Sequence, residues 1–268
     1  MSIANYDQLV AGLLPPSSFD KAAGTAEAAG EYFSAWYLTG RPGAGVAPSS
    51  GLNGAALTAT VSGQLPTAGT VTGKQAYLAS MRAAQGGNVG TVRLLDRLYA
   101  NSGYTVTSTG SQASTHAGLP SRDSNGSNTG AGVGLALEVS TATTNAGVVT
   151  ATISYTNESG VAGRTGTITV PITAVAGHWA EMDLQAGDFG VRSFQSLTLS
   201  ASLVTGAIHL VQFREITAID QPADNRGDRM SPLECFGPVY DGSVLALVYL
   251  ATGTAVGRVR GGLRLAQG

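Results

Sequence analysis

Short alternations of apolar and hydroxyl side chains are the feature that most constrains the fold of this chain. In residues 149–156, four apolar residues alternate with four Ser or Thr residues, and residues 196–202 alternate in the same way. Successive side chains of a β-strand point to opposite faces, so each run has one apolar face and one hydroxyl face. The pattern predicts strands that cover a core on one side only.

Similar runs recur from residue 88 to the end of the chain, separated by turn segments such as 157–164. The expected strands are 91–100, 104–109, 132–140, 149–156, 167–172, 196–202, 207–216, 243–252 and 258–267. Short strands at this spacing predict an all-β fold, an antiparallel two-sheet sandwich of jelly-roll type. Residues 207–216 and 243–252 are apolar on both faces, which is typical of covered central strands. Pro171 lacks an amide donor and indicates an edge strand or a strand end.

Residues 1–87 differ from this β domain, which we place at 88–268. Residues 26–38 and 73–87 have apolar side chains at mixed helical spacing, and Gly and Pro interrupt the chain between them. We therefore expect an extended N-terminal arm with one or two short helices. Phe33, Trp36 and Tyr37 follow the i, i+3, i+4 spacing of a helix face and are the expected anchors on a neighbouring subunit. The alternative is an ordinary helical cap, with these aromatics in its core.

Composition excludes several function classes. Only 12% of the residues are charged, the formal net charge is −2, and no block of Lys or Arg occurs, which argues against a nucleic-acid partner. The single cysteine, Cys235, cannot form an internal disulfide or a structural zinc site alone. No apolar run reaches 18 residues and the first residues lack a signal-peptide pattern, so we expect no membrane partner and synthesis in a cytoplasm.

Candidate metal ligands are scattered or poorly spaced. His116, His178 and His209 lie in different runs, and packed, hydrogen-bonded histidines are the better interpretation. Residues 122–130 gather oxygen-bearing side chains that could surround a hard cation, but the glycine is misplaced for an EF-hand and no closing Glu follows. A polar surface loop is favoured for this segment. We predict no metal and no cofactor.

Candidate catalytic groups are equally weak. Glu181, Asp183 and Asp188 lie close in sequence, but no polar cleft is implied, so they are interpreted as loop charges. No Ser lies on a strand-to-helix elbow, and Cys235 has no local histidine partner. We expect that the protein is not an enzyme.

Four segments in order give the chain a family resemblance. They are "LLDRLYANSGYTVTSTGSQ", "LPSRDSNGSNTGAGVGLALEVS", "ISYTNESGVAGRTGTITV" and "LQAGDFGVRSFQSLTLSASLVTGAIHLVQFREI". Together with the leading "AGEYFSAWYLTGRPGAG", they resemble virion proteins of tailed bacteriophages through "YTN…G…GRT" and "GD.GVRS.QSLTLS". The resemblance spans most of residues 25–217 and brings no catalytic residues with it.

The resemblance implies a structural role in the particle, in decoration or cementing of the capsid or as a minor head protein. The implied partners are other virion proteins, the major capsid protein first, and further copies of this chain, with a trimer as the first expectation. The implied localisation is the virion, assembled in the cytoplasm of the bacterial host.

Two rival functions remain open at this stage. One is a host-attachment or carbohydrate-binding module at the neck or tail, with exposed aromatics on a concave sheet face. Its candidates are Tyr104, Tyr155, Tyr240 and Tyr249. The other is a glycan hydrolase, which would need an acidic pair across a cleft.

Overall fold

A computed structural model of the chain describes residues 3–24, 28–67, 73–87, 90–221, 228–230, 237–253 and 257–268. Antiparallel strands dominate this part of the chain, which has one short α-helix, α1 (Tyr6–Ala11), and one 3-10 turn, η1 (Ala35–Tyr37). The chain divides into two compact units. The first unit comprises Met1–Val46, Thr58–Asp96 and Glu215–Gly268, and the second comprises Ala47–Leu57 and Arg97–Arg214. The expected all-β, antiparallel class is confirmed.

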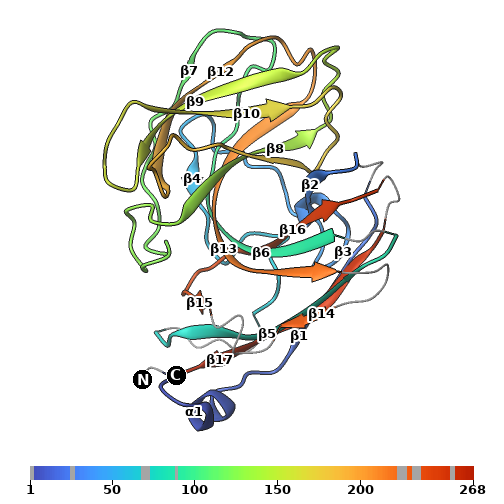
Figure 1. The fold of residues 1–268 in the computed structure, drawn as a ribbon, viewed down its shortest axis with the longest axis vertical. Helices are drawn as coiled ribbons and strands as arrows, with labels where there is room; N and C mark the ends of the chain where they lie inside the picture. The colour runs from blue at the N-terminus through green and yellow to red at the C-terminus, as the bar shows by residue number, and fades with distance from the viewer. Residues whose placement is uncertain are drawn as a thin grey trace. The chain divides into compact units, whose positions relative to one another are not determined.

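One sheet of the first unit has the strand order β14-β5-β17-β1-β3, with β15 also paired to β5 (Figure 1). Its strands are β1 (Ser17–Lys21), β3 (Gly40–Arg41), β5 (Ala76–Gln85), β14 (Asp228–Met230), β15 (Pro238–Val239) and β17 (Val259–Gln267). Phe19 of β1, Leu263 of β17 and Met81 of β5 are buried on one face of this sheet. Helix α1 packs Leu9 against Ala79 and Ala266 of the same sheet.

A second group of strands in the first unit centres on β16 (Leu245–Ala251), which pairs with β2 (Glu31–Ser34) and with β6 (Gly90–Ala100). Leu245, Leu247 and Tyr249 are all buried, as expected for a covered central strand. Strand β6 and strand β13 (Ala207–Gln221) each run from one unit into the other along their length.

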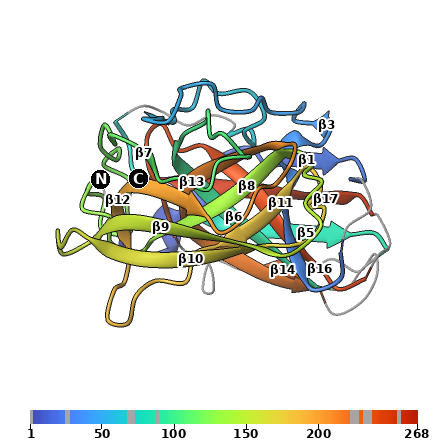
Figure 2. The ribbon, with the colours of Figure 1, turned by 90° about the horizontal axis from the view of Figure 1, so that it is seen from above.

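The second unit contains a four-stranded sheet in the order β10-β9-β12-β7. Its strands are β7 (Gln112–Ala113), β9 (Val149–Asn157), β10 (Arg164–Val170) and β12 (Val191–Leu199). Figure 2 shows β9, β10 and β12 side by side. Along β9 buried residues alternate with more exposed hydroxyl residues, as the sequence predicts. Strand β10 is an edge strand and ends immediately before Pro171, which confirms both expectations for this proline.

The remaining strands of the second unit pair around β8, between β11 and the first part of β13, while β4 pairs with β6. They are β4 (Ala55–Ala56), β8 (Val133–Thr141) and β11 (His178–Glu181). Buried side chains of β8 and β13 share one apolar cluster with those of β9, β10 and β12. The second unit therefore holds two sheet layers around one core, and the two-sheet jelly-roll sandwich expected over residues 88–268 is not confirmed.

The prediction of helices in residues 26–38 and 73–87 is wrong for the described residues. Residues 76–85 form β5, which lies between two other strands. Its register with β17 shifts, because Arg264 faces Ser80 whereas Leu265 faces Leu78. Ala79 is thus the extra residue of a β-bulge. Because of this bulge, Leu78 and Met81 are buried on the same face of the strand although they are three positions apart. This spacing is the same as on one face of a helix.

The second expected helix is replaced by a strand and a turn. Glu31–Ser34 form β2, and the Oγ of Ser34 then accepts a hydrogen bond of 3.2 Å from the backbone N–H of Trp36 at the start of η1. Phe33 therefore lies on a strand and Trp36 in the 3-10 turn that follows it, so their spacing of three does not come from one helix. By their contacts, residues 47–57 belong to the second unit and β5 to the first, while the division of the chain at residue 87 stays a prediction.

Candidate functional site

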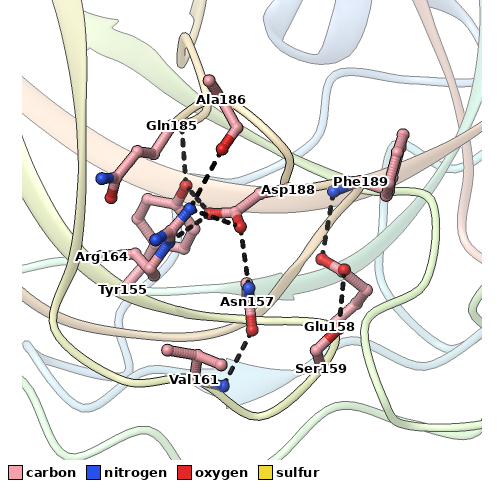
Figure 3. A network of polar contacts seen from close by, with 10 residues as sticks. All are labelled: Tyr155, Asn157, Glu158, Ser159, Val161, Arg164, Gln185, Ala186, Asp188 and Phe189. Carbon is pink, nitrogen blue, oxygen red and sulfur yellow. Dashed lines mark hydrogen bonds and ion pairs between the residues drawn. The ribbon is translucent and has the colours of Figure 1, made fainter.

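Four residues of the motifs that carry the phage resemblance meet at one end of the β9–β10 hairpin. Figure 3 shows Tyr155, Asn157 and Arg164 directed toward Asp188, which precedes β12. The carboxylate of Asp188 accepts hydrogen bonds from Tyr155 Oη at 2.5 Å and Asn157 Nδ2 at 2.8 Å. Arg164 donates to it from Nε and Nη2, both at 2.9 Å. This cluster, the Asp188 network, ties the 185–190 loop to the hairpin.

Electrostatics make Asp188 a permanent carboxylate. The hydrogen bonds from Arg164, and then those from Tyr155 and Asn157, lower the pKa of Asp188 to about 2. Burial and the neighbouring carboxylate raise the pKa of Tyr155. At neutral pH Asp188 is therefore ionised and Tyr155 is protonated. With four donors on its two oxygens, Asp188 is arranged to hold structure in place.

The Asp188 network also fixes the loop backbone. Tyr155 Oη accepts from the amide of Gln185 at 2.9 Å, and Asn157 Oδ1 accepts from the amide of Val161 at 2.8 Å. Glu158 accepts from the amide of Phe189 at 3.1 Å. The ring of Phe189 is 77% exposed and Val161 is 51% exposed. A rigid, polar frame thus presents two apolar side chains to solvent, which is typical of a contact surface.

The loop proposed as a possible cation site is folded around its own carboxylate. Asp123 is fully buried and accepts from the amides of Asn125, Ser127 and Thr129 and from the hydroxyls of the latter two, at 2.7 to 3.1 Å. Burial alone would raise the pKa of Asp123, but these hydrogen bonds lower it to about 2. Both oxygens of this carboxylate therefore accept hydrogen bonds from the loop itself.

The three histidines lie apart in the structure and are packed. His116 stacks on Tyr99 with ring centroids 3.8 Å apart, and its Nε2 lies 2.5 Å from Gln212 Oε1. His209 contacts the carbonyl of Asn101 through Nδ1 at 3.0 Å. Burial lowers the pKa of His178 to about 4 and also lowers those of His116 and His209. Within the described ranges no group of His, Cys, Asp or Glu residues is arranged to hold a metal ion.

The three aromatic residues expected at an interface, Phe33, Trp36 and Tyr37, differ in burial. Phe33 is 3% exposed and Trp36 is 2% exposed, and the indole Nε1 of Trp36 donates to the carbonyl of Val46 at 3.1 Å. These two side chains are core residues of the first unit, which was the alternative left open for them. Tyr37 is half-buried in η1. A contact of Phe33, Trp36 and Tyr37 with a neighbouring subunit stays a prediction.

Other candidates are also placed by the structure. Tyr104, Tyr155 and Tyr249 are buried, and Tyr240 is half-buried, so these residues do not form an exposed aromatic platform for a sugar. Glu181 accepts from Trp179 Nε1 at 2.9 Å, and Asp183 is exposed. Cys235 lies outside the described residues.

Several buried charged side chains were not anticipated, among them an ion pair and a lysine. Arg97 and Glu138 form a two-pronged ion pair, with both N–O distances at 2.7 Å, in the core of the second unit. Lys21 is 2% exposed and donates from Nζ to the carbonyls of Leu38, Pro42 and Gly43 at 3.0 to 3.1 Å. Burial lowers the pKa of Lys21 to about 8. Glu138 interrupts the apolar run of β8, which could have signalled it, whereas Lys21 lies in the mostly polar strand β1 and has no such signal.

Comparisons with known proteins give little further information. No protein-family model matches the chain, and no curated protein matches it. A solved structure of the D431N mutant VP2 protein of infectious bursal disease virus, in derived T=1 particles, is similar at 11% identity, with a TM-score of 0.18 over 99% of this chain and 80% of that chain. A TM-score this low does not establish a common fold. Among the described helices none is long and apolar enough to span a membrane.

Proposed function

We propose that this chain is a non-enzymatic structural protein of a tailed-phage virion, which binds and stabilises the capsid as a decoration, cement or minor head protein. The observation that carries the proposal is the Asp188 network. The residues through which the sequence resembles phage virion proteins are those that hold the loop bearing Phe189 in place. Their role is to build a contact surface, as a structural protein requires.

The frame also suits a particle that must survive outside a cell. The Asp188 and Asp123 carboxylates are held by neutral or cationic donors of their own unit, and both stay ionised well below neutral pH. A loop that is already ordered loses little conformational entropy when it docks, so more of its contact energy remains for binding. The partners in this proposal are the major capsid protein and further copies of this chain, as a trimer.

The proposal is tested with particles. Phe189→Ser, which leaves the Asp188 network in place, is expected to reduce co-purification of the protein with particles and to lower the temperature at which the particles release DNA. Val148→Ser is the matched control, since Val148 is also an exposed apolar residue, at 59%, but lies immediately before β9. Particles that lack the protein and are as stable as complete particles would exclude the stabilising role.

Carbohydrate binding is the second candidate, at the neck or tail. Burial of three of the four candidate tyrosines weakens it. A glycan array probed with the full chain gives the direct answer, and binding that survives Phe189→Ser would favour this candidate over the first.

A further inference from the structure

One face of the β5–β17–β1–β3 sheet gathers a third of the basic residues of the chain. Directly opposite residues of an antiparallel pair point to the same face, as do residues two apart on one strand. In the register Ser18, Gly262 and Arg82 are opposite one another, and Asp20 faces both Arg260 and Arg41. The other face, with Phe19, Leu263 and Met81, is buried.

This outward face, called the basic face below, is defined by nine residues: Ser18, Asp20, Arg41, Ser80, Arg82, Arg258, Arg260, Gly262 and Arg264. Five of the 15 Lys and Arg residues of the chain are among them, against a single acid. Arg41, Arg82, Arg258 and Arg260 are exposed. In a chain whose net charge is −2, this is a strong local excess of positive charge.

The basic face is hollowed at its centre. A hollow of about 550 Å³ is lined by Ser18, Ser80, Arg82, Gly262 and Arg264, with Pro16, Ser17, Met81 and Leu263. Gly262 forms its floor, and a Cβ atom there would lie 2.9 Å from the carbonyl oxygen of Ser17 and 3.6 Å from Nε of Arg82. Nε of Arg82 thus lies next to a position without a side chain, and Ser18 and Ser80, which also line the hollow, carry hydroxyl groups that can donate to an anion.

The face already holds one carboxylate. Arg258 donates to Asp20 from Nε at 3.0 Å and from Nη2 at 2.8 Å, in the two-pronged geometry that guanidinium groups form with carboxylates. Every cation of the basic face is Arg rather than Lys, and the planar guanidinium is the better partner for a planar carboxylate. The charge and the hydrogen-bond geometry are therefore both complementary to acidic side chains.

Nucleic acid is the less suitable partner. None of the nine residues that define the basic face is aromatic, so they offer a base nothing to stack on, and the chain as a whole is acidic rather than basic. From these observations we propose that the basic face is a docking surface for a carboxylate-rich polypeptide segment of a partner protein. The inference goes beyond the proposed virion role, because it names a surface and the chemistry of its partner and can be tested on the isolated chain.

The test uses fluorescein-labelled poly-L-glutamate as the probe and fluorescence anisotropy of the full chain as the readout, at low ionic strength. Arg82→Ser combined with Arg260→Ser is expected to weaken binding about tenfold, since two exposed ion-pair partners are removed. Lys74→Ser combined with Arg192→Ser is the matched control, with the same change in net charge at exposed positions outside the basic face. It is expected to change binding less than about twofold.

A third variant separates the effect of positive charge from that of guanidinium hydrogen-bond geometry. Arg82→Lys combined with Arg260→Lys keeps the charge but removes both guanidinium forks, and it is expected to show an intermediate loss. Circular dichroism confirms that each variant is folded. The proposal is overturned if the wild type does not bind poly-L-glutamate, if the two double Ser variants bind it equally, or if a DNA duplex binds the basic face more tightly than the polypeptide does.

Discussion

Arg164 and Asp188 lie 24 positions apart and form a two-pronged ion pair, with Nε and Nη2 of the arginine each 2.9 Å from a carboxylate oxygen. Strand β10 supplies the arginine and the loop before β12 supplies the acid. Since Tyr155 and Asn157 of β9 donate to the same carboxylate, one side chain connects three segments of the second unit. The loop that carries Phe189 depends on this carboxylate for its position.

Asp188→Asn is expected to lower the Tm at neutral pH, because the amide cannot accept from all four donors. The folded-state pKa of Asp188, about 2, is below its ordinary value of 3.8, so its contribution is fully present above pH 4 and is lost as the pH falls toward 2. Thermal unfolding from pH 7 to pH 2 should therefore show the wild type and the variant converging in acid. Asp183→Asn, at an exposed position nearby, should leave the pH profile unchanged.

Asp123→Asn is expected to lower the free energy of unfolding by about 2 kcal/mol, since a buried acceptor for several amides is replaced by a group that is half donor. Ser127→Ala removes one hydroxyl donor and should cost about 1 kcal/mol. Urea unfolding measures both. A larger loss from Ser127→Ala than from Asp123→Asn would contradict the central place of this carboxylate in the 122–130 loop.

Lys21→Met is expected to lower the free energy of unfolding by about 2 kcal/mol, since three carbonyl groups lose their donor. The pKa of Lys21 is about 8 in the folded chain and has an ordinary value of 10.5, so the unfolded chain binds more protons between these values. The contribution of Lys21 to the free energy of unfolding therefore rises as the pH increases from 8 to 10.5. Chemical unfolding across that range should show the rise in the wild type and not in the variant.

Gly45→Ala is expected to cost about 2 kcal/mol, because the new Cβ would lie 2.3 Å from Cε2 of the buried Trp36 indole. Gly43→Ala is the matched control two residues earlier, where a Cβ meets nothing within 4 Å. Urea unfolding followed by tryptophan fluorescence should show a loss for the first variant and a change within about 0.5 kcal/mol for the second. Equal effects would mean that Trp36 is not packed as described.

The strands of the second unit could be predicted from the sequence because the side-chain period of two survives in them. The expected strands 132–140, 149–156 and 207–216 correspond closely to β8, β9 and the first part of β13. The expected strand at 104–109 is absent, and Thr105–Ser108 turn back instead through a hydrogen bond of 3.0 Å. The Ser and Thr residues of this segment are compatible with a turn as well as with a strand, and the segment has too few apolar residues to favour the strand.

The site was harder to predict, because it depends on which strands become neighbours. Tyr155 and Asp188 belong to different runs, and neither run alone indicates that the phenol and the carboxylate will meet. Asp188 was interpreted as a loop charge for this reason. The basic face could not be predicted for a similar reason. Arg82 and Arg260 are far apart along the chain, and only the pairing of β5 with β17 brings them to one surface.

The bulge at Ala79 acts as a phase shift in β5. If β5 were a regular strand that kept all ten of its residues, either Arg82 would turn into the apolar interior or Leu78 would turn out to water. Deletion of Ala79 would leave both faces of β5 in register and remove only the side chain that packs against Leu9 and Ala266, whereas a strict period of two through Ala79 would assign half of the strand to the wrong side.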